Sequence, residues 1–236
     1  MSELLKINNL WGGYKEGVDI LRGISMEVQQ GEAVGIIGLN GSGKSTFGKA
    51  IMNMIPIRKG EILFEGEDIT ALSTSELTHR GISIMQQGGK VFRNLSVWDN
   101  LQLAGQGRSA QLAEIIPLLQ KPKSQLQHLM ADKLSGGQKH QLSLAMTLAT
   151  NPRLVILDEP SAGLSPKAIE EMYQMLRAAK ENLNVTIILI EQNIAKAVDL
   201  CDRSFLIGQG AIKGEFKNEE IIEIGEIMFK NKAKKL

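Results

Sequence analysis

The chain has 236 residues, of which 43% are hydrophobic and 22% are charged, and its formal net charge is +1. This is an ordinary globular composition, and the length allows one large domain or one core with a smaller lobe. The charge balance argues against a basic nucleic-acid surface and against an acidic tail. The single cysteine, Cys201, cannot form an internal disulfide, so we expect a reducing compartment and a small buried side chain rather than a reactive thiol.

No apolar stretch approaches the ~20 residues that a membrane-spanning helix needs. The longest such runs cover residues 154–157 and 185–190. Residues 1–6 lack a basic region followed by an apolar one, so no secretory signal is expected. We therefore expect a soluble protein that stays where it is made and reaches a membrane only through a partner.

Residues 4–30 are predicted to form β structure, because apolar and polar residues alternate and turns are expected at 12–13 and 16–17. Trp11 and Tyr14 lie in this region, although aromatic residues make up only 4% of the chain. Near a nucleotide site an aromatic ring can stack on the base. From the residues alone, a partly buried strand side chain is the interpretation favoured for both.

The stretch EAVGIIGLNGSGKST, residues 32–46, contains the pattern G-x-x-x-x-G-K-[ST] at every fixed position. Residues 33–37 predict a buried strand before the pattern, and residues 46–54 predict a helix after it. Backbone N–H groups at such a helix start bind phosphate, glycine lets the phosphate approach the backbone, and the lysine adds positive charge. The pattern therefore predicts a nucleoside-triphosphate site, with the Ser45 hydroxyl on Mg²⁺. The expected binding residues are Gly38, Asn40, Gly41, Ser42, Gly43, Lys44, Ser45 and Thr46.

Strands are predicted at residues 61–64 and 81–85, with a short helix at 73–79 between them. Gln87 follows the second of these strands directly. In a nucleotide-binding fold such a glutamine can reach a metal ion or a water at the γ-phosphate. A solvated loop residue is the alternative, and the residues alone leave it open.

Residues 96–130 read as leucine-rich helices interrupted by glycine and proline, which predicts a smaller helical lobe. Ser135 is then expected to cap a long helix that ends near Thr150. Gly136 and Gly137 would stand in its first turn, where glycine is costly for helix formation. Because exposed N–H groups at a helix start bind anions, a second anion site is a plausible reason for these glycines.

The apolar run at residues 154–157 leads into Asp158 and Glu159. In open α/β sheets ligands bind beyond the carboxyl ends of strands, so these acids are expected to face the phosphates. Asp158 can hold Mg²⁺, and Glu159 can orient and deprotonate an attacking water. The alternative is a pair of solvated charges at a strand end.

The remaining chain continues the alternation of strands and helices, which predicts an α/β fold with a mainly parallel sheet. Ser165 and Pro166 are expected to start a helix as N-cap and first residue. The further predicted elements are a helix to about 181, a strand at 185–190, a helix at 193–200, strands at 204–207 and 211–213 around a turn at 208–210, a terminal helix at 219–229 and a basic tail at 230–236.

Three motifs, in this order and spacing, resemble those of ATPase subunits of ABC transporters: residues 38–45, LSGGQ at 134–138, and residues 154–159. LSGGQ is the discriminating one, because other P-loop families lack it. The resemblance extends from the Tyr14 region to about Gly214. It implies a P-loop NTPase core with a mainly parallel sheet, an N-terminal antiparallel β subdomain and a small helical subdomain. The expected division of this single ATPase domain is 1–90 with 150–215 for the core and β subdomain, about 91–149 for the helical subdomain, and 216–236 for a C-terminal helix and tail.

The same resemblance assigns roles to residues. It places Tyr14 on adenine. It places Gln87 at the junction of core and helical lobe, as a ligand of Mg²⁺ beside Ser45 and Asp158. The residues that it places over the γ-phosphate held by another subunit are Ser135, Gly136, Gly137 and Gln138. It implies ATP and Mg²⁺, a head-to-tail homodimer or a heterodimer with a paralogous ATPase, transmembrane permease subunits, and indirectly a solute-binding protein. The chain would then lie on the cytoplasmic face of the cell membrane, with no nucleic-acid partner.

Two positions depart from the family pattern. Gln192 stands where a histidine is usual, and Ser165 stands where an aspartate usually ends the loop after Glu159. A neutral amide can hydrogen-bond a phosphate oxygen, but it cannot carry a proton as imidazole can. In the sequence segments DEPSAGLSP and IEQN the chain is similar to ATPase subunits of branched-chain amino-acid and related amide importers, although that subgroup often carries glutamate in place of Gln87.

The expected function is therefore ATP hydrolysis, with Glu159 as base and with Gln192 and Gln87 beside it, driving import of branched-chain amino acids or a similar small polar solute. Permeases would dock where the helical lobe meets the Gln87 loop. ATPases of lipid or lipopolysaccharide exporters share most of these motifs and are one alternative. A soluble ABC ATPase acting on DNA or ribosomes is another, disfavoured by the single cassette and the lack of a heptad insertion or basic field.

Overall fold

The computed structural model describes residues 2–105, 109–217 and 220. The predicted terminal helix at 219–229 and the basic tail lie outside the described residues, apart from Glu220. The chain forms two compact units, one of residues 1–72 with 188–236 and one of residues 73–187. The fold is mixed α/β with a mostly parallel sheet, as the alternation of strands and helices predicted, and with a separate antiparallel sheet, as the family resemblance implied.

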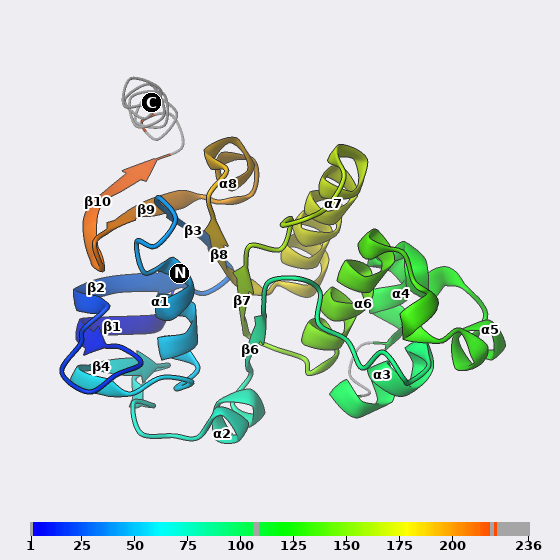
Figure 1. The fold of residues 1–236 in the computed structure, drawn as a ribbon, viewed down its shortest axis with the longest axis horizontal. Coiled ribbons are helices and arrows are strands. Elements are labelled where there is room, and N and C mark those ends of the chain that lie inside the picture. Colours follow the sequence, from blue (N-terminus) through cyan, green and yellow to red (C-terminus); the bar gives the residue numbers. More distant parts are fainter. Residues whose placement is uncertain (1, 106–108, 218–219, 221–236) are drawn as a thin grey trace. The chain divides into compact units, whose positions relative to one another are not determined.

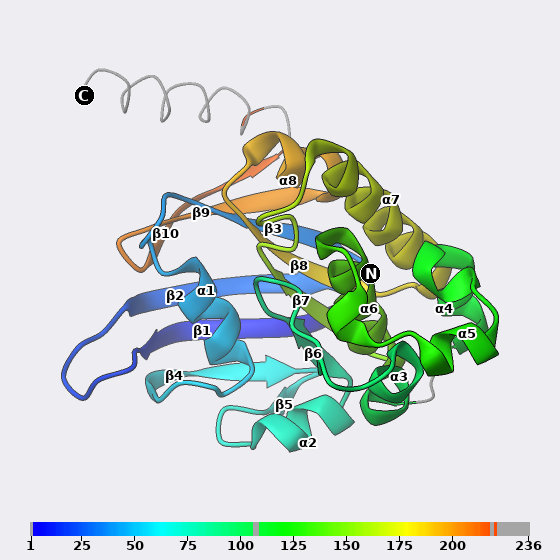
Figure 2. The ribbon, with the colours of Figure 1, turned by 45° about the vertical axis from the view of Figure 1, so that its right-hand side comes forward.

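The antiparallel sheet of the first unit has the strand order β2-β1-β4-β5 (Figure 2). It consists of β1 (Glu3–Gly12), β2 (Leu21–Gln29), β4 (Ile57–Phe64) and β5 (Glu67–Asp68). The predictions of β structure over 4–30 and 61–64 are confirmed. The strand β4, predicted at 61–64, starts earlier, at Ile57, because Gly12 pairs with Ile57 and Trp11 with Lys59. The first part of β4 was not predicted because it contains polar residues.

The parallel strands of the first unit carry the predicted phosphate loop. In this unit β3 (Ala33–Ile37) pairs in parallel with β9 (Arg203–Gly208), and β9 pairs antiparallel with β10 (Ala211–Lys217). Every residue of β3 is buried, which agrees with the apolar run at 33–37. The strand β10 runs past the predicted end at Lys213, because Lys217 still pairs with Arg203.

The helix after the phosphate loop, α1 (Lys44–Ile51), lies alongside the antiparallel sheet (Figures 1 and 2). The predicted bounds of 46–54 were wrong at both ends. Helical hydrogen bonding begins earlier, because the N–H of Phe47 already donates to the carbonyl of Gly43 at 2.9 Å. The helix ends before Asn53, which has φ +49° and whose side-chain amide donates to the carbonyls of Ile69 and Leu72, both at 2.8 Å. That side chain ties the helix end to the following loop.

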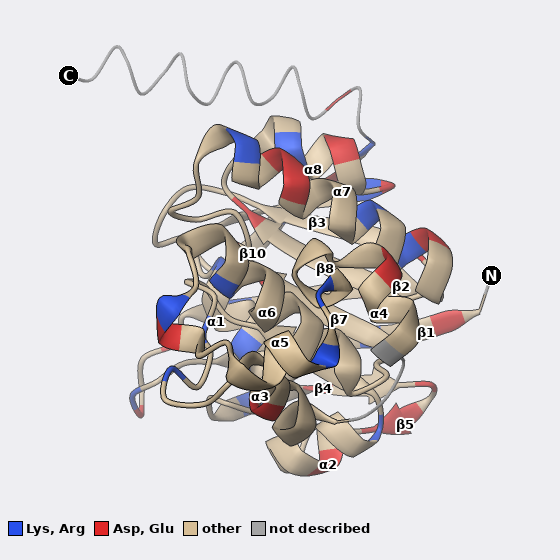
Figure 3. Cartoon of the chain, turned by 90° about the vertical axis from the view of Figure 1, so that its right-hand side faces the viewer, with Lys and Arg blue, Asp and Glu red and all other residues tan. Residues whose placement is uncertain are grey.

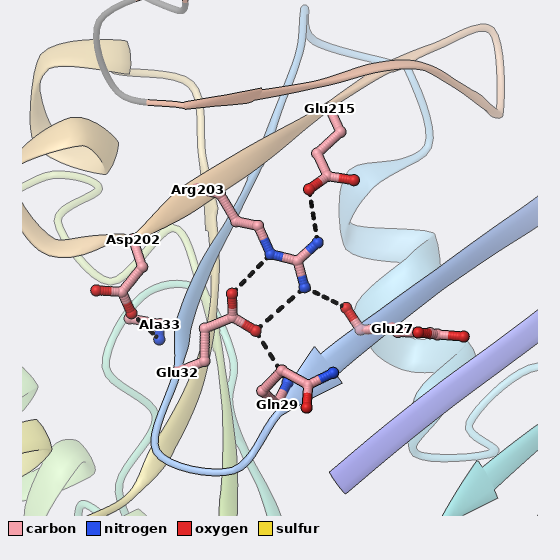
Figure 4. Close-up of polar contacts among 7 residues, drawn as sticks. All are labelled: Glu27, Gln29, Glu32, Ala33, Asp202, Arg203 and Glu215. Atoms are coloured by element: carbon pink, nitrogen blue, oxygen red, sulfur yellow. Dashed lines mark hydrogen bonds and ion pairs between the residues drawn. The ribbon is translucent and has the colours of Figure 1, made fainter. Parts of the chain in front are cut away.

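A cluster around Arg203 joins the start of β3 to β2, β9 and β10 (Figure 4). The guanidinium lies 2.6 and 3.1 Å from the two carboxylate oxygens of Glu32 and 2.8 Å from Glu215, and it donates to the carbonyl of Glu27 at 2.7 Å. Glu32 also accepts from the N–H of Gln29 at 2.9 Å. The pKa of Arg203 is raised above its ordinary value, first by the hydrogen bond to Glu32. The cluster therefore keeps its positive centre and fixes the turn that leads into β3.

The second unit has two parallel strands. β6 (Ile82–Met85) pairs with β7 (Leu154–Asp158) so that Ser83 faces Val155. Before β6 stands α2 (Thr74–His79), and after β7 comes α7 (Pro166–Leu183), along which acidic and basic positions are interspersed (Figure 3). The strand β8 (Thr186–Glu191) passes from this unit into the first, where α8 (Ile194–Leu200) follows it.

The helices predicted over 96–130 are present in the second unit. The elements from there to β7 are α3 (Val97–Ala104), α4 (Ser109–Ile115), a 3₁₀ turn (Pro117–Gln120), α5 (Lys123–His128), a second 3₁₀ turn (Ala131–Lys133) and α6 (Gly136–Ala149). The helix α6 packs against α3, α4 and β6, and leucines such as Leu112, Leu126 and Leu142 are buried. Across the described residues, each helix is too short or too polar to cross a membrane.

Candidate nucleotide-binding and catalytic site

The loop from Gly38 to Ser45 connects β3 to α1 in the first unit, and two of its glycines are required by the fold. Gly38 has φ +156°, and a Cβ atom there would lie 2.2 Å from the carbonyl oxygen of Ile207. Gly43 has φ +105° at the N-cap of α1. Other residues rarely adopt these conformations, so the loop can be built only with glycine at both places.

Two polar side chains of this loop, Lys44 and Ser42, are buried. The ammonium of Lys44, a residue only 4% exposed, donates to the carbonyls of Gly38 at 2.9 Å and Leu39 at 3.1 Å. The hydroxyl of Ser42 is buried and has no hydrogen-bond partner within the described part of the chain. A buried cation and a buried hydroxyl beside the N–H groups of a helix start fit an anionic phosphate ligand.

The remaining predicted residues of the loop differ in exposure. Asn40 and Gly41 are exposed, Ser45 is half-buried and Thr46 is buried. Gly41 has φ +78°, and a Cβ there would meet no described atom within 4 Å. The outer side of the loop is thus open to solvent, whereas its end at α1 is held by the helix.

The aromatic residues Trp11 and Tyr14 have different surroundings. Trp11 is half-buried on β1, and its indole N–H donates to the side-chain oxygen of Asn9 at 2.9 Å. Tyr14 is 51% exposed, with the ammonium of Lys49, on α1, 5.6 Å from its ring centre. Tyr14 therefore presents a ring to solvent beside the helix that follows the phosphate loop, while Trp11 fits the partly buried strand position.

In the second unit the structure brings Gln87 and Glu159 together. Asp158 is buried as the last residue of β7, and Glu159 follows it half-buried. The side-chain amide of Gln87 donates to the Glu159 carboxylate at 2.8 Å. Glu159 has φ +48°, and a left-handed conformation in a residue other than glycine costs ~1–3 kcal/mol and is typical of functional sites. The burial of Asp158 speaks against the alternative of a solvated charge at that residue.

The signature residues open α6 with a complete capping box. The hydroxyl of Ser135 accepts from the N–H of Gln138 at 3.2 Å, and the Gln138 side chain accepts from the N–H of Ser135 at 3.0 Å. A Cβ at Gly136 would meet no described atom within 4 Å, and one at Gly137 would lie 3.4 Å from the Ala168 methyl group. These residues line a cavity of about 560 Å³ together with Gly163, Ser165 and the start of α7. The backbone at this helix start is therefore open to a group from outside.

Of the two departures from the family pattern, Ser165 has a side chain with a local structural role. The exposed Ser165 caps α7, because its hydroxyl accepts from the N–H of Ala168 at 3.4 Å and Pro166 follows it, as predicted. Gln192 is half-buried between β8 and α8, and its N–H donates to the buried Glu191 carboxylate at 3.1 Å. The side chain of Asn193 then caps α8.

One contact to the phosphate loop was not predicted. The N–H of Gly210, in the turn between β9 and β10, donates to the carbonyl of Ser42 at 2.9 Å. The turn at 208–210 was predicted from its glycines, but its contact partner lies far away in sequence. No local pattern could have indicated it.

Comparison with known proteins extends the motif evidence to most of the chain. A family profile described as ABC transporter matches residues 21–162. The high-affinity branched-chain amino acid transport ATP-binding protein BraG of Pseudomonas aeruginosa is 31% identical over 204 residues, which cover 84% of this chain and 87% of that protein. The lipopolysaccharide export system ATP-binding protein LptB of Escherichia coli K12 is 30% identical over 225 residues, covering 93% and 92%. Among solved structures, a dimeric ATP-binding cassette in a post-hydrolysis state with ADP and Pi has a TM-score of 0.77 at 25% identity, covering 91% of this chain and 99% of that one.

Proposed function

The chain belongs to the ABC transporter family of ATP-binding subunits and is an ATPase, and from that premise we propose the transport step that it drives. We propose that it powers import of branched-chain amino acids, or of a related small polar solute, through separate permease subunits. The hydrolytic part rests on the Gln87–Glu159 hydrogen bond at the end of β7. The proposed identity of the transported solute rests on the sequence segments DEPSAGLSP and IEQN, and the similarity to BraG supports it.

The residues of the proposed site divide the work of hydrolysis. The backbone of residues 38–45 and the ammonium of Lys44 bind the phosphates, and Tyr14 stacks on adenine. Ser45, Asp158 and Gln87 are the proposed ligands of Mg²⁺, which when bound neutralises phosphate charge. Glu159 orients the attacking water and accepts its proton. Gln192 donates a hydrogen bond to a phosphate oxygen without carrying a proton.

The open signature backbone supports a catalytic dimer. Ser135 and Gly136 are exposed, and the first turn of α6 offers N–H groups with room for a phosphate oxygen. We propose that Ser135, Gly136, Gly137 and Gln138 close over ATP held by a second copy of the chain or by a paralogous ATPase. Each phosphate loop is then half of a site, and hydrolysis requires pairing.

The permease subunits are proposed to dock on the second unit near the Gln87 loop. Phe92 is 54% exposed, and its backbone is held by Asn100, whose side chain accepts from the Phe92 N–H at 2.8 Å and donates to its carbonyl at 3.0 Å. A fixed, exposed aromatic residue suits an interface anchor. The chain would thereby be held on the cytoplasmic face of the membrane, with a solute-binding protein acting on the permeases from the other side.

Export of a lipid or lipopolysaccharide is the second candidate, because similarity to LptB covers 93% of this chain. The two can be separated with the chain reconstituted beside the permeases encoded next to its gene. Stimulation of ATPase activity by a leucine-loaded solute-binding protein supports import. Stimulation by lipopolysaccharide alone, with no response to any amino acid, overturns the import proposal. Co-purification with ribosomes or DNA instead of permeases would favour the non-transport alternative.

The substitution Glu159→Gln tests the proposed base. The variant should bind ATP, accumulate as an ATP-bound dimer and lose at least ~100-fold in turnover, since an amide cannot accept the proton. A matched control is Glu170→Gln, because Glu170 lies exposed on α7 beside Arg177. Chromatography with ATP and a phosphate-release assay measure both effects. Full hydrolysis by Glu159→Gln would overturn the assignment of the base.

A further inference from the structure

The turn between β9 and β10 supports the phosphate loop from outside the nucleotide-binding motifs. We propose that Gly210 is a positioning residue for nucleotide binding, whose N–H holds the Ser42–Gly43 peptide so that the N–H of Gly43 points to the phosphate. This inference rests on the proposed role of residues 38–45 as the phosphate site. It adds a residue that carries none of the motifs.

Gly210 connects two parts of the first unit through its own backbone. Its N–H donates to the carbonyl of Ser42 at 2.9 Å, and its carbonyl accepts from the N–H of Arg22 at 2.8 Å. Ser42 belongs to the phosphate loop, and Arg22 belongs to β2, which follows the loop carrying Tyr14. One glycine in the turn thus bridges the phosphate loop and the strand beyond the aromatic loop.

The planarity of the peptide bond gives the Gly210 contact its consequence. The carbonyl of Ser42 and the N–H of Gly43 belong to one trans peptide, so they point in opposite directions. Because Gly210 holds the carbonyl toward the β9–β10 turn, the Gly43 N–H is directed to the opposite side of the loop. Gly43 is the N-cap of α1, where N–H groups bind anions. The hydrogen bond therefore selects the peptide orientation that binds phosphate.

Only glycine fits at position 210. Gly210 has φ +80°, and a Cβ atom there would lie 1.8 Å from the carbonyl oxygen of Ile20. The Cα of Gly210 is also 3.5 Å from the place where a Cβ on Gly43 would stand. Any side chain must therefore push the turn away from Ile20, and the turn carries the N–H that Ser42 accepts.

The hydrogen bond of Gly210 stands beside a gap in the packing between the phosphate loop and the β9–β10 turn. A cavity of about 320 Å³ lies between residues 39–42 and residues 206–209, with Lys213 at its edge. Side-chain packing does not fill this space, so the backbone contact of Gly210, together with the pairing of β3 with β9, sets the distance between turn and loop. Loss of that contact frees the Ser42–Gly43 peptide to rotate.

The test compares Gly210→Ala with Gly66→Ala in the full chain. Gly66, in the turn between β4 and β5, also has φ +80°, but a Cβ there would meet no described atom within 4 Å. Both glycines have the same φ, and only the substitution at Gly210 disturbs the phosphate loop. We expect the Kd for ATP and for ADP to rise about tenfold in Gly210→Ala, the effect of one lost hydrogen bond, and to stay within about twofold in Gly66→Ala.

Fluorescent-nucleotide titration measures these constants, and kcat at saturating ATP should fall less than the Kd rises. Equal affinity in Gly210→Ala and the natural chain overturns the inference. Failure of the natural chain itself to bind ATP overturns instead the proposed function on which the inference rests. The two failures are therefore distinguishable.

A measurement on the natural chain keeps the inference testable if Gly210→Ala does not fold. Hydrogen exchange of a peptide covering residues 206–213 should slow when saturating ADP is added, because ordering the loop orders the carbonyl that Gly210 binds. A peptide covering residues 63–68 serves as control and should not change. Unchanged exchange at 206–213 in the presence of bound ADP contradicts the inference.

Discussion

The phosphate loop in the first unit and the signature turn in the second both place glycines at the start of a helix, but for different reasons. A Cβ at Gly38 would lie 2.2 Å from a backbone oxygen, and Gly43 has a φ that favours glycine. At Gly136 there is open space among the described residues, and φ is negative. The fold thus requires glycine in the phosphate loop. At position 136 the fold explains neither the open space beside the backbone nor the presence of glycine, a residue that weakens a helix.

The phosphate loop is held in place by contacts within the chain, whereas the signature turn has open space beside its backbone. The phosphate loop is held by β9, by the turn at Gly210 and by its own Lys44. The signature turn has the capping box of Ser135 and Gln138 at its base, and the carbonyl oxygen of Gly136 lies 3.0 Å from Nδ1 of His140. A glycine that the fold does not need is explained by a group that approaches from another molecule. This open space is the observation that supports our proposal of a signature turn closing over the partner's nucleotide.

The largest expected effect is that of Gly38→Ala. The new methyl group collides with the carbonyl of Ile207, and alanine is strained at φ +156°. We expect the free energy of unfolding to fall by about 3 kcal/mol, from overpacking and backbone strain together. ATP binding should be lost as the loop moves. Urea unfolding and nucleotide titration measure the two losses.

The control for Gly38→Ala is Gly17→Ala, because Gly17 has φ +74° and a Cβ there would meet no described atom within 4 Å. It should cost about 1 kcal/mol, from strain alone. If Gly38→Ala is no less stable than Gly17→Ala and still binds ATP, the phosphate loop does not depend on its glycines as the packing indicates.

The opposite separation is expected for Gly136→Ala. Because the methyl group meets open space and alanine favours the helix, the free energy of unfolding should stay the same or rise by about 0.5 kcal/mol. ATP should still bind, since the phosphate loop is untouched. Turnover should fall more than about tenfold, because the methyl group occupies the place of the partner's phosphate.

Comparison with Gly137→Ala sharpens the second prediction. A Cβ at Gly137 would make an ordinary contact of 3.4 Å with Ala168 inside the same unit. Steady-state phosphate release and dimer formation with ATP distinguish a closure defect from a folding defect. Undiminished turnover in Gly136→Ala would contradict the proposed difference between the two turns, because Gly136 would then be needed neither for folding nor for the partner's nucleotide.

The features predicted well from the sequence are those that depend on residues close together in the chain. The strand β3 and the caps at Ser135 and Ser165 follow from local patterns of apolar residues, glycine, proline and hydroxyl groups. Arg203 and Glu32 are 171 positions apart, so no local pattern announces their pairing. The support of the phosphate loop by Gly210 was missed for the same reason. Tyr14 shows a third case, since only the family resemblance reversed the strand interpretation that composition favoured.

The smallest expected effect concerns the capping boxes, which again differ between a purely structural helix and the signature helix. At α2 the box uses an acid: the Glu76 carboxylate accepts from the N–H of Ser73 at 2.8 Å and from its hydroxyl at 2.6 Å. These bonds, the hydroxyl first, lower the pKa of Glu76 below its ordinary value. At α6 the same position holds the neutral Gln138. A neutral cap leaves the N-terminal charge of the signature helix available to phosphate.

The pH dependence of Glu76→Gln tests this difference. Because the folded pKa of Glu76 is lowered, its stabilising contribution is present above the ordinary pKa of a glutamate and is lost as pH falls through the lowered value. The variant should therefore lose less stability than the natural chain between pH 7 and pH 3, as urea midpoints measure. Gln138→Glu should introduce such a dependence at α6 and slow turnover at pH 7, where its carboxylate repels the partner's phosphate. A Gln138→Glu variant with full turnover would show that the signature turn meets no anion, and the contrast between the two glycine turns would then be one of local structure alone.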